Sequence, residues 1–289
     1  MKGFEKIGKD CTISVNNLEV GSDVIIGNNV TIICDSFKIG RNSVIGDNVT
    51  ITCNKFECGD WLFMTKGVEI GRGGCNGPNS NVKIGNHVGI FENTIINPSE
   101  TVEIGDNVGI GAEVMIWTHG AWLDVMKGFP SDFGPVKIGN DVWLPARSIV
   151  LPNVEIEDNI VIGIGSIINR SLPKGCFAAG SPCKVIKENC YPKELDKIEK
   201  KTLVFNILRD WKKLHKYKGG FDCFLEYNEN WDYIKLVQFD YSPNNGQETI
   251  FDLKNRTISG GEDEVSEDLR DYLRRRGIKI FTDKPFKSI

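Results

Sequence analysis

Histidine is the residue type in this chain best suited to proton transfer at neutral pH, and it is scarce. The sequence holds three, His87, His119 and His215. An imidazole titrates near pH 6.5, so it can take a proton from an attacking nucleophile and return it to a leaving group. A histidine in a strand-like run has no assigned chemistry by itself. His119 differs because it lies in IWTHG, at the mouth of a long interruption in an otherwise regular sequence.

That regularity is a unit of six residues: an aliphatic residue, Gly, and four mostly polar or small residues. Ile7, Ile26 and Ile45 are 19 residues apart, and Ile138 and Ile156 are 18 apart. Three units per step predict a triangular coil with a short strand on each side and a turn at each corner. We expect the aliphatic residues to stack inside, and Gly, Asn and Asp to lie at corners, where positive φ is tolerated. The clearest units begin at Ile7, Val20, Ile26, Ile39, Ile45, Ile70, Ile84, Ile104, Ile110, Ile138 and Ile162.

Two segments interrupt the repeat, and insertions in a solenoid form loops on one face. The first is RGGCNGPNSN at 72–81. The second is GAWLDVMKGFPSDFGP at 120–135, which carries much apolar surface for a loop. We expect this second loop to pack against a neighbouring subunit or to close over a substrate. A packing flap without chemistry is the alternative.

Residues 138–188, IGNDVWLPARSIVLPNVEIEDNIVIGIGSIINRSLPKGCFAAGSPCKVIKE, resemble the hexapeptide-repeat acyltransferases. The pattern is most similar to the maltose, galactoside, xenobiotic and polysialic-acid O-acetyltransferases. The resemblance covers residues 1–188 and is most specific over 104–188. It implies a left-handed parallel β-helix, an exception to the usual right-handed crossover. It also implies a homotrimer with active sites between subunits.

The resemblance also implies roles for individual residues. In the resembled enzymes a His and a Trp with the spacing of His119 and Trp143 are the general base and a wall of the donor site. The N–H groups that hold the oxyanion correspond to Ala146 and Ile164. Lys184, in AGSPCK, corresponds to a partner of a CoA phosphate. The implied donor is acetyl-CoA, with no metal and no covalent acyl-enzyme.

This chain departs from the family pattern at two places near the implied site. It has Leu144-Pro145 where the family has an aliphatic residue and Gly, and Pro145 offers no N–H. It has Ile164 where the family usually has Ala, which narrows the groove for the pantetheine arm of CoA.

The acceptor side is less defined by the sequence. Glu92 and Asn93 replace a regular unit one coil before His119, and Trp122 and Asp124 lie in the second loop. These four are the candidates for binding sugar hydroxyls or for orienting the imidazole.

A sugar hydroxyl is a weak nucleophile at neutral pH, so its acetylation from a thioester needs a base. We therefore predict an acetyl-CoA-dependent O-acetyltransferase that acts on a sugar or oligosaccharide of a surface polysaccharide. N-acylation of a nucleotide-linked amino sugar is the alternative, since an amine needs less help from a base. A non-catalytic β-helix scaffold is the second alternative.

A zinc lyase is the strongest competitor from another class, because a carbonic-anhydrase family uses the same β-helix. Zinc catalysis needs three protein ligands and an open position. His87 and His119 are the only histidines in the repeat region, and the cysteines lack the close pairing of zinc motifs. We exclude this class on the ligand count.

The repeat stops after residue 187, and the composition changes. We divide the chain into a β-helix domain at 1–188, a connecting helix at 189–218 and a small α+β domain at 219–289. The helix is expected from Pro192 to Lys218. Strands are expected at 221–227, 233–239, 248–253 and 278–281, with a helix capped by Ser266 before the last. The apolar face expected of the connecting helix contains Leu195, Ile198, Phe205, Leu208, Trp211 and Leu214.

Composition excludes other classes. A net charge of −4 over 289 residues argues against a nucleic-acid binder held by phosphate contacts. The longest uncharged apolar run, 159–169, is too short to cross a bilayer. The N-terminus lacks the apolar stretch of a secretory signal. Nine cysteines in a chain without such a signal predict a cytoplasmic protein with free thiols.

Overall fold

The structure is a computed structural model that describes residues 3–75, 77–220, 223–228, 230–238, 247–282 and 284. The chain divides into two compact units, Met1–Lys193 and Glu194–Ile289. Among the described residues, no helix combines the length and apolar character that crossing a membrane requires.

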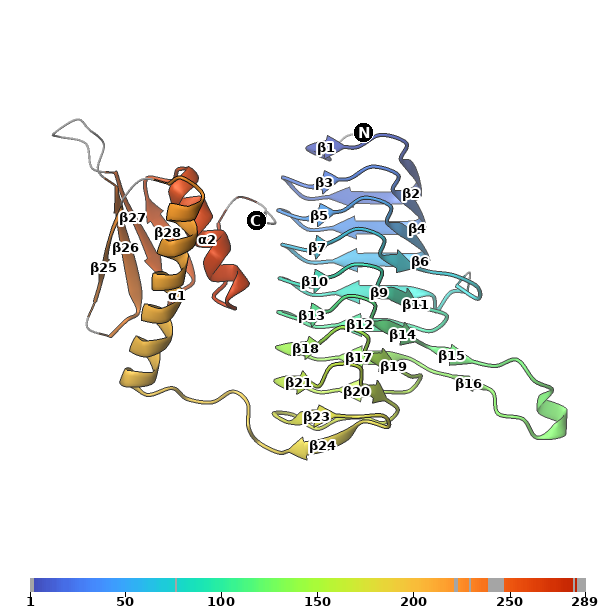
Figure 1. Cartoon of the computed structure of the whole chain (residues 1–289). Helices are drawn as coiled ribbons and strands as arrows, with labels where there is room; N and C mark the ends of the chain where they lie inside the picture. The colour runs from blue at the N-terminus through green and yellow to red at the C-terminus, as the bar shows by residue number, and fades with distance from the viewer. Residues whose placement is uncertain are drawn as a thin grey trace. The chain divides into compact units, whose positions relative to one another are not determined.

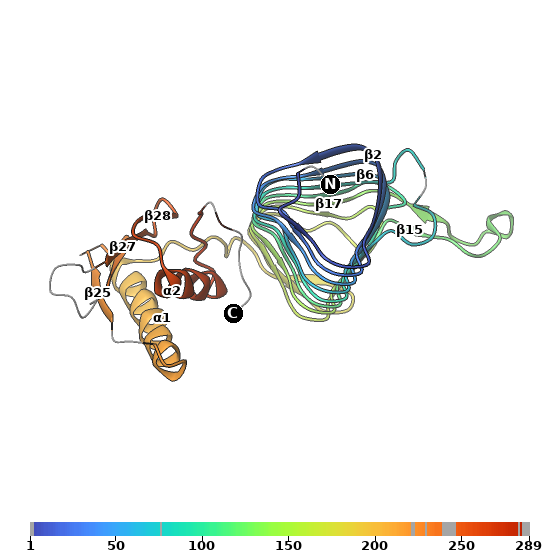
Figure 2. The same cartoon turned by 90° about the horizontal axis from the view of Figure 1, so that it is seen from above.

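The first unit is a left-handed parallel β-helix with a triangular cross-section (Figures 1 and 2). We name its three sides faces A, B and C, in the order in which the chain visits them. Face A contains β1 (Lys6–Ile7), β3 (Ile25–Ile26), β5 (Val44–Ile45), β7 (Phe63–Met64), β10 (Gly89–Ile90), β13 (Gly109–Ile110), β18 (Val142–Leu144), β21 (Ile160–Ile162) and β23 (Phe177–Ala179). The antiparallel β24 (Lys184–Lys187) ends this sheet.

Faces B and C belong to one sheet that bends around a corner. Face B contains β8 (Glu69–Ile70), β11 (Ile95–Asn97), β14 (Met115–Trp117), β19 (Ile149–Val150) and β22 (Ile167–Ile168). Face C contains β9 (Asn81–Ile84), β12 (Val102–Ile104), β17 (Val136–Ile138) and β20 (Glu155–Ile156). In the first coils the long strands β2 (Thr12–Val20), β4 (Thr31–Ile39) and β6 (Thr50–Cys58) continue from face B to face C.

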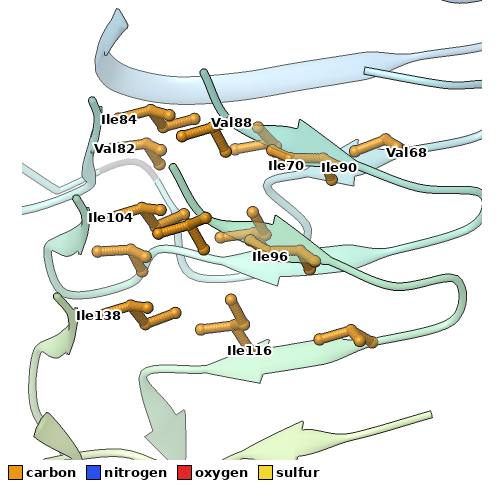
Figure 3. Close-up of a cluster of buried hydrophobic side chains, with 14 of the residues drawn as sticks. Val68, Ile70, Val82, Ile84, Val88, Ile90, Ile96, Ile104, Ile116 and Ile138 are labelled. Carbon is orange, nitrogen blue, oxygen red and sulfur yellow. The ribbon is translucent and has the colours of Figure 1, made fainter. Parts of the chain in front are cut away.

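The strand register confirms the spacing of the repeat. Ile7 pairs with Ile26 and Ile26 with Ile45, and further along the chain Ile138 pairs with Ile156. The aliphatic residues point inward and form columns along the β-helix, as Figure 3 shows for Ile84, Ile104 and Ile138. These three side chains are each 3% exposed. Burying an isoleucine stabilises the fold by about 1.5–3 kcal/mol, so each buried residue of these columns contributes on this scale.

The glycines of the repeat serve a different purpose from the one expected. Among the glycines of the clearest units only Gly71 has a positive φ, at +136°; at the other coils positive φ falls on residues such as Asn29, Asn48 and Asn107. A Cβ on Gly27 would lie 2.7 Å from the backbone nitrogen of Asp47, and one on Gly40 would lie 2.4 Å from the next coil. These glycines are therefore needed because adjacent coils approach closely, and the corner conformation is left mainly to Asn and Asp.

A row of alternating Asp and Asn follows the corner between faces C and A. It consists of Asp60, Asn86, Asp106, Asn140 and Asp158. Each of the last four accepts a hydrogen bond through Oδ1 from the backbone N–H of the member one coil earlier, at 2.6–2.9 Å. The Asn side chains also donate to the Asp that follows, at 3.1 Å. We call this the Asp/Asn row.

A row of alternating charge follows the outer surface of face C. Its members are aligned by the strand register, and the row is called the Glu/Lys row: Glu19, Lys38, Glu57, Lys83, Glu103, Lys137 and Glu155. Lys38 Nζ lies 3.4 Å from Glu19 and 3.9 Å from Glu57.

The second unit packs two helices on one face of an antiparallel sheet (Figure 1). The sheet order is β25 (Cys223–Tyr227), β26 (Tyr233–Gln238), β27 (Gln247–Asp252) and β28 (Thr257–Gly260). The helices are α1 (Lys197–Tyr217) and α2 (Glu264–Arg275). Buried Trp211 of α1 donates to Asp268 of α2 at 2.9 Å, which links the two helices.

Several expectations for this unit are corrected by the structure. The connecting helix begins at Lys197, because Asp196 and Glu199 form a capping box there. Its buried face contains Val204, Ile207, Leu208, Trp211 and His215, whereas Ile198 and Phe205 are exposed. The expected apolar face was thus partly wrong.

Two further corrections concern the end of the chain. Asp263 caps α2, and Ser266 is the third helical residue of the capping box. Residues 278–281 form no strand; Ile280 is buried in the core, and Ile278 N–H donates to Leu273 at the end of α2. Residues 221, 222 and 239, at the ends of two expected strands, lie outside the described residues.

Candidate active site

His119 lies where the chain leaves the corner between faces B and C. β14 ends at Trp117, and His119 begins β15 (His119–Gly120), which pairs with β16 (Asp132–Phe133). These two strands form the base of a projecting segment, the second interruption of the repeat, which we call the arm (Figure 2). Buried Thr118 holds the backbone where the chain leaves the corner: its Oγ1 donates to Asn97 O at 2.8 Å and accepts from Glu100 N–H at 2.9 Å. The imidazole is therefore held by a rigid corner.

Aromatic rings contact the imidazole on two sides. Phe133 stacks on it with ring centroids 5.5 Å apart and an interplanar angle of 21°. Trp117 meets it edge-on at 6.1 Å. The side chain is half-buried, so it is restrained by packing while it keeps contact with solvent.

The Nδ1 atom of His119 faces a small polar cluster. It lies 2.9 Å from Asn97 Oδ1 and 3.0 Å from Ser99 Oγ, and those two oxygens are 3.1 Å apart. Asn97 is fully buried, and its Nδ2 donates to Gly71 O at 3.0 Å and Gly73 O at 3.2 Å. The histidine is thus connected to the glycine-rich segment that first interrupts the repeat.

The glycine-rich segment approaches the histidine as bare backbone. Gly74 has φ of +87°, and a Cβ there would lie 2.8 Å from Ser99 Oγ and 3.9 Å from His119 Cε1. Cys75 beside it is buried, and its thiol donates to Gly71 O at 3.3 Å. Burial raises the pKa of the Cys75 thiol, so it stays protonated at neutral pH.

The residues predicted to bind the donor gather on face A and at the corner between faces A and B. Trp143, in β18, is 40% exposed, and its ring lies over Gly109, where a Cβ would be 2.4 Å from Trp143 Cε3. Ala146 and Ile164 lie at the A–B corner in successive coils. Ile164 is 74% exposed. Lys184 pairs with Ala179 at the last edge of face A, with its side chain exposed.

Glu92 and Asn93 lie at the same A–B corner, not beside His119. They connect β10 of face A to β11 of face B. Asn93 has φ of +56° and donates its N–H to Lys66 O, and Glu92 O accepts from Glu113 N–H. The structure therefore groups both residues with Ala146 and Ile164.

The arm exposes its apolar side chains. Trp122 is 95% exposed and Met126 is 90% exposed. Asp124 caps the short 3₁₀ helix η1 (Val125–Lys127), since its Oδ1 accepts from Met126 N–H at 3.0 Å. Its side chain also lies 3.8 Å from Lys127 Nζ. Exposure of this much apolar surface is typical of a segment that is covered by another chain or a ligand.

The two groups of candidate residues lie on opposite sides of the triangle. His119 is at the corner between faces B and C, which is opposite face A and Trp143. A single chain therefore does not bring His119 and Trp143 into one site.

The other two histidines have separate surroundings. His87 stacks on Trp61 with ring centroids 4.4 Å apart at the corner between faces C and A. His215 lies in the second unit, stacked on Trp211. Over the described residues, no three His, Cys, Asp or Glu side chains are grouped as metal ligands.

Sequence reasoning missed Asn97, Ser99 and Phe133, which contact His119. One signal was present: Asn97 follows Ile96 where the repeat has Gly, as in Ile70-Gly71 one coil earlier. A buried asparagine in place of that glycine indicates a polar partner inside the corner.

Comparison with known proteins gives a partial match. No family model matches the chain. Galactoside O-acetyltransferase of Escherichia coli K12 is 48% identical over 54 residues, which is 19% of this chain and 27% of that protein. A Saccharomyces cerevisiae protein classed as an acetyltransferase is 39% identical over 112 residues, 38% of this chain and 57% of that protein.

A solved structure gives a further likeness. The polysialic-acid-specific acetyltransferase NeuO is 20% identical, with a TM-score of 0.45 over 76% of this chain and 99% of that one. The chain spans between about a quarter and three fifths of the two relatives it matches by sequence. Over these local stretches, on a β-helix built from six-residue units, the chain is similar to acetyltransferases.

Proposed function

We propose that the protein transfers an acetyl group from acetyl-CoA to a sugar hydroxyl, with His119 as the general base. The observation that carries this proposal is the setting of His119. Its ring is restrained by Phe133 and by a buried amide, and it remains half exposed at the mouth of the arm. A base in this setting keeps its position during proton transfer and can still be reached by an acceptor.

The chemistry asked of His119 is modest. As the hydroxyl oxygen attacks the thioester carbonyl, the imidazole takes the hydroxyl proton, and it then returns a proton to the departing thiolate. The backbone N–H groups of Ala146 and Ile164 are the proposed donors to the developing oxyanion. Pro145 has no N–H, so it contributes none.

The residues around Trp143 fit the donor. Acetyl-CoA supplies an acetyl group already activated as a thioester. Trp143 and Ile164 offer exposed apolar surface suited to the pantetheine arm, and Lys184 is an exposed cation at the end of the same face. A lysine there can neutralise a phosphate as a point charge.

The opposite positions of His119 and Trp143 support an active site between subunits. We propose a cyclic homotrimer in which the B–C corner of one copy faces face A of the next. The arm then covers its exposed Trp122 and Met126 against a neighbouring copy. Both substrates would meet between two chains.

The acceptor class is proposed as a sugar of a surface polysaccharide. N-acylation of a nucleotide-linked amino sugar remains the alternative, and it would depend less on His119. A non-catalytic scaffold would bind no acetyl-CoA.

The test is mass spectrometry of an acceptor panel incubated with acetyl-CoA and either the wild type or His119→Ala. The panel holds free sugars, oligosaccharides, nucleotide sugars and nucleotide amino sugars. We expect a base-labile ester from the wild type, and turnover lowered by about 10²–10⁴-fold in the variant with CoA binding retained. A stable amide formed equally by both proteins would favour the N-acyl alternative. No product and no CoA binding would favour the scaffold.

A further inference from the structure

We propose that Asn97 sets the tautomer of His119, keeping the proton on Nδ1 so that Nε2 carries the lone pair that acts as the base. Asn97 is thus a positioning residue that acts through the histidine. Its consequence for catalysis rests on the proposed function, but the tautomer itself does not.

The orientation of the Asn97 amide is fixed by backbone groups whose roles cannot change. Its Nδ2 faces two carbonyl oxygens, Gly71 O at 3.0 Å and Gly73 O at 3.2 Å. Its Oδ1 faces the N–H of Ser99 at 3.3 Å. A reversed amide would place an oxygen against two acceptors and an NH₂ against a donor, all in a fully buried position.

This orientation decides the state of the imidazole. His119 Nδ1 lies 2.9 Å from Asn97 Oδ1, which can only accept, so the proton of a neutral ring must be on Nδ1. Ser99 does not decide the tautomer, because a hydroxyl can donate or accept. Its Oγ–H donates to Asn97 Oδ1 at 3.1 Å, and its lone pairs face Nδ1 at 3.0 Å.

The same contacts explain why an amide suits this position better than a carboxylate. A carboxylate at 97 would also accept from Nδ1, but its second oxygen would face Gly71 O and Gly73 O. Asn97 therefore has two functions: its Oδ1 holds the imidazole, and its Nδ2 holds the glycine-rich segment against the corner. Asn97→Asp keeps the first function and removes the second.

A neutral histidine without such a partner favours the proton on Nε2. Nε2 then has no free lone pair and cannot act as the base. Removing the Asn97 side chain should therefore lower the fraction of His119 that can accept a proton. With the proposed function we expect Asn97→Ala to lower kcat by about 10²-fold, while KM for acetyl-CoA changes little.

The experiment uses the full chain with ¹⁵N-labelled histidine, above the pH at which the rings titrate. Long-range ¹H–¹⁵N spectra report which ring nitrogen is protonated, and His119 is assigned by loss of its signals in His119→Gln. We expect the Nδ1–H form in the wild type and in Asn97→Asp, and a shift to the Nε2–H form in Asn97→Ala. Ser99→Ala, the matched control, should keep the Nδ1–H form.

A wild-type His119 in the Nε2–H form, or an unchanged tautomer in a folded Asn97→Ala, would overturn the proposal. The signals of His87 and His215 report whether the variant is folded. If Asn97→Ala fails to fold, the wild type and Ser99→Ala still decide. The readout needs no substrate, so a confirmed tautomer with no acetylated product would contradict only the proposed function.

Discussion

At the scale of single residues, glycines decide where the rings of the candidate site can lie. Gly109 has no side chain, so the Trp143 ring can lie directly over its backbone. Gly74 likewise lets the backbone of the glycine-rich segment approach Ser99 and His119. In both places the missing Cβ makes room for a neighbouring residue. The positions of the candidate residues therefore depend on residues with no chemistry of their own.

Gly109→Ala tests the role of Trp143. The new methyl would lie 2.4 Å from Trp143 Cε3, so the ring must tilt away. We expect KM for acetyl-CoA to rise about tenfold, equivalent to about 1.4 kcal/mol, with the fold kept. Gly89→Ala, one coil earlier in the same register, is the control, because its methyl meets Phe91 at 3.3 Å instead. Equal effects of the two variants would argue against a special role for Trp143.

Cys58 links residue chemistry to stability at alkaline pH. Burial raises the pKa of its thiol from the ordinary 9.0 to about 12. The folded form keeps the proton that the unfolded chain loses, so this contribution is complete below pH 9 and is lost as the pH rises towards 12. The loss is about 1.4 kcal/mol per pH unit. We expect Cys58→Val to flatten the fall of unfolding free energy over this range in urea titrations, whereas Cys11→Ser keeps it. A parallel fall in wild type and Cys58→Val would refute the assignment.

At the scale of elements, the β-helix could be predicted and the polar contacts at its corner could not. The step of 18 or 19 residues sets the register, because each aliphatic residue has one inward position per coil. The contact of His119 with Asn97 joins the start of the second interruption to a strand residue 22 positions earlier, and Asn97 in turn binds a glycine-rich segment in another coil. No local period predicts such a contact.

The same distinction applies to the second unit. The helix α1 has a period of 3.6, but its sequence offers two apolar stripes, and packing against β26 and β27 buried the one with Val204 and Ile207. The run 278–281 has strand-like residues, yet Ile280 is buried in the core and Ile278 N–H donates to Leu273 O at the end of α2. Tertiary packing decided both outcomes.

The Glu/Lys row gives a prediction for one element. Lys38→Glu would place three acidic residues in successive coils, with Glu19 and Glu57 on either side. We expect a loss of about 0.5–1 kcal/mol of unfolding free energy that diminishes with added salt. The triple variant Glu19→Lys, Lys38→Glu, Glu57→Lys restores the alternation among these three and should recover most of it. A loss unaffected by salt or by the triple variant would exclude an electrostatic cause.

At the scale of the whole molecule, the β-helix holds its candidate site residues in two separate groups. His119 and its arm occupy one corner, and Trp143 with Ile164 occupies the opposite side. The arm exposes apolar rings that a solitary chain would leave in water. In the proposed trimer, a second copy supplies the half of the site that each single chain lacks.

Mixed oligomers test this arrangement. His119→Ala and Trp143→Ala chains, each poorly active alone, are co-expressed with different tags and purified through both. In a mixed cyclic trimer one interface joins an intact His119 to an intact Trp143, so activity should return to about one third of wild type. Light scattering measures the assembly directly. Mixed oligomers as inactive as their parents would place the site within one chain.

The two surface rows have a bearing on how such a gene can change in length. Coils that carry Glu103 or Glu155 also carry Asp106 or Asp158, and the coil that carries Lys137 carries Asn140. Duplicating one coil would put like charges in neighbouring coils of the Glu/Lys row, and two carboxylates or two amides together in the Asp/Asn row. Duplicating two adjacent coils preserves both alternations. We therefore expect that insertions and deletions tolerated during evolution add or remove pairs of coils. The pair of coils, not the single coil, is the unit by which this β-helix can change in length.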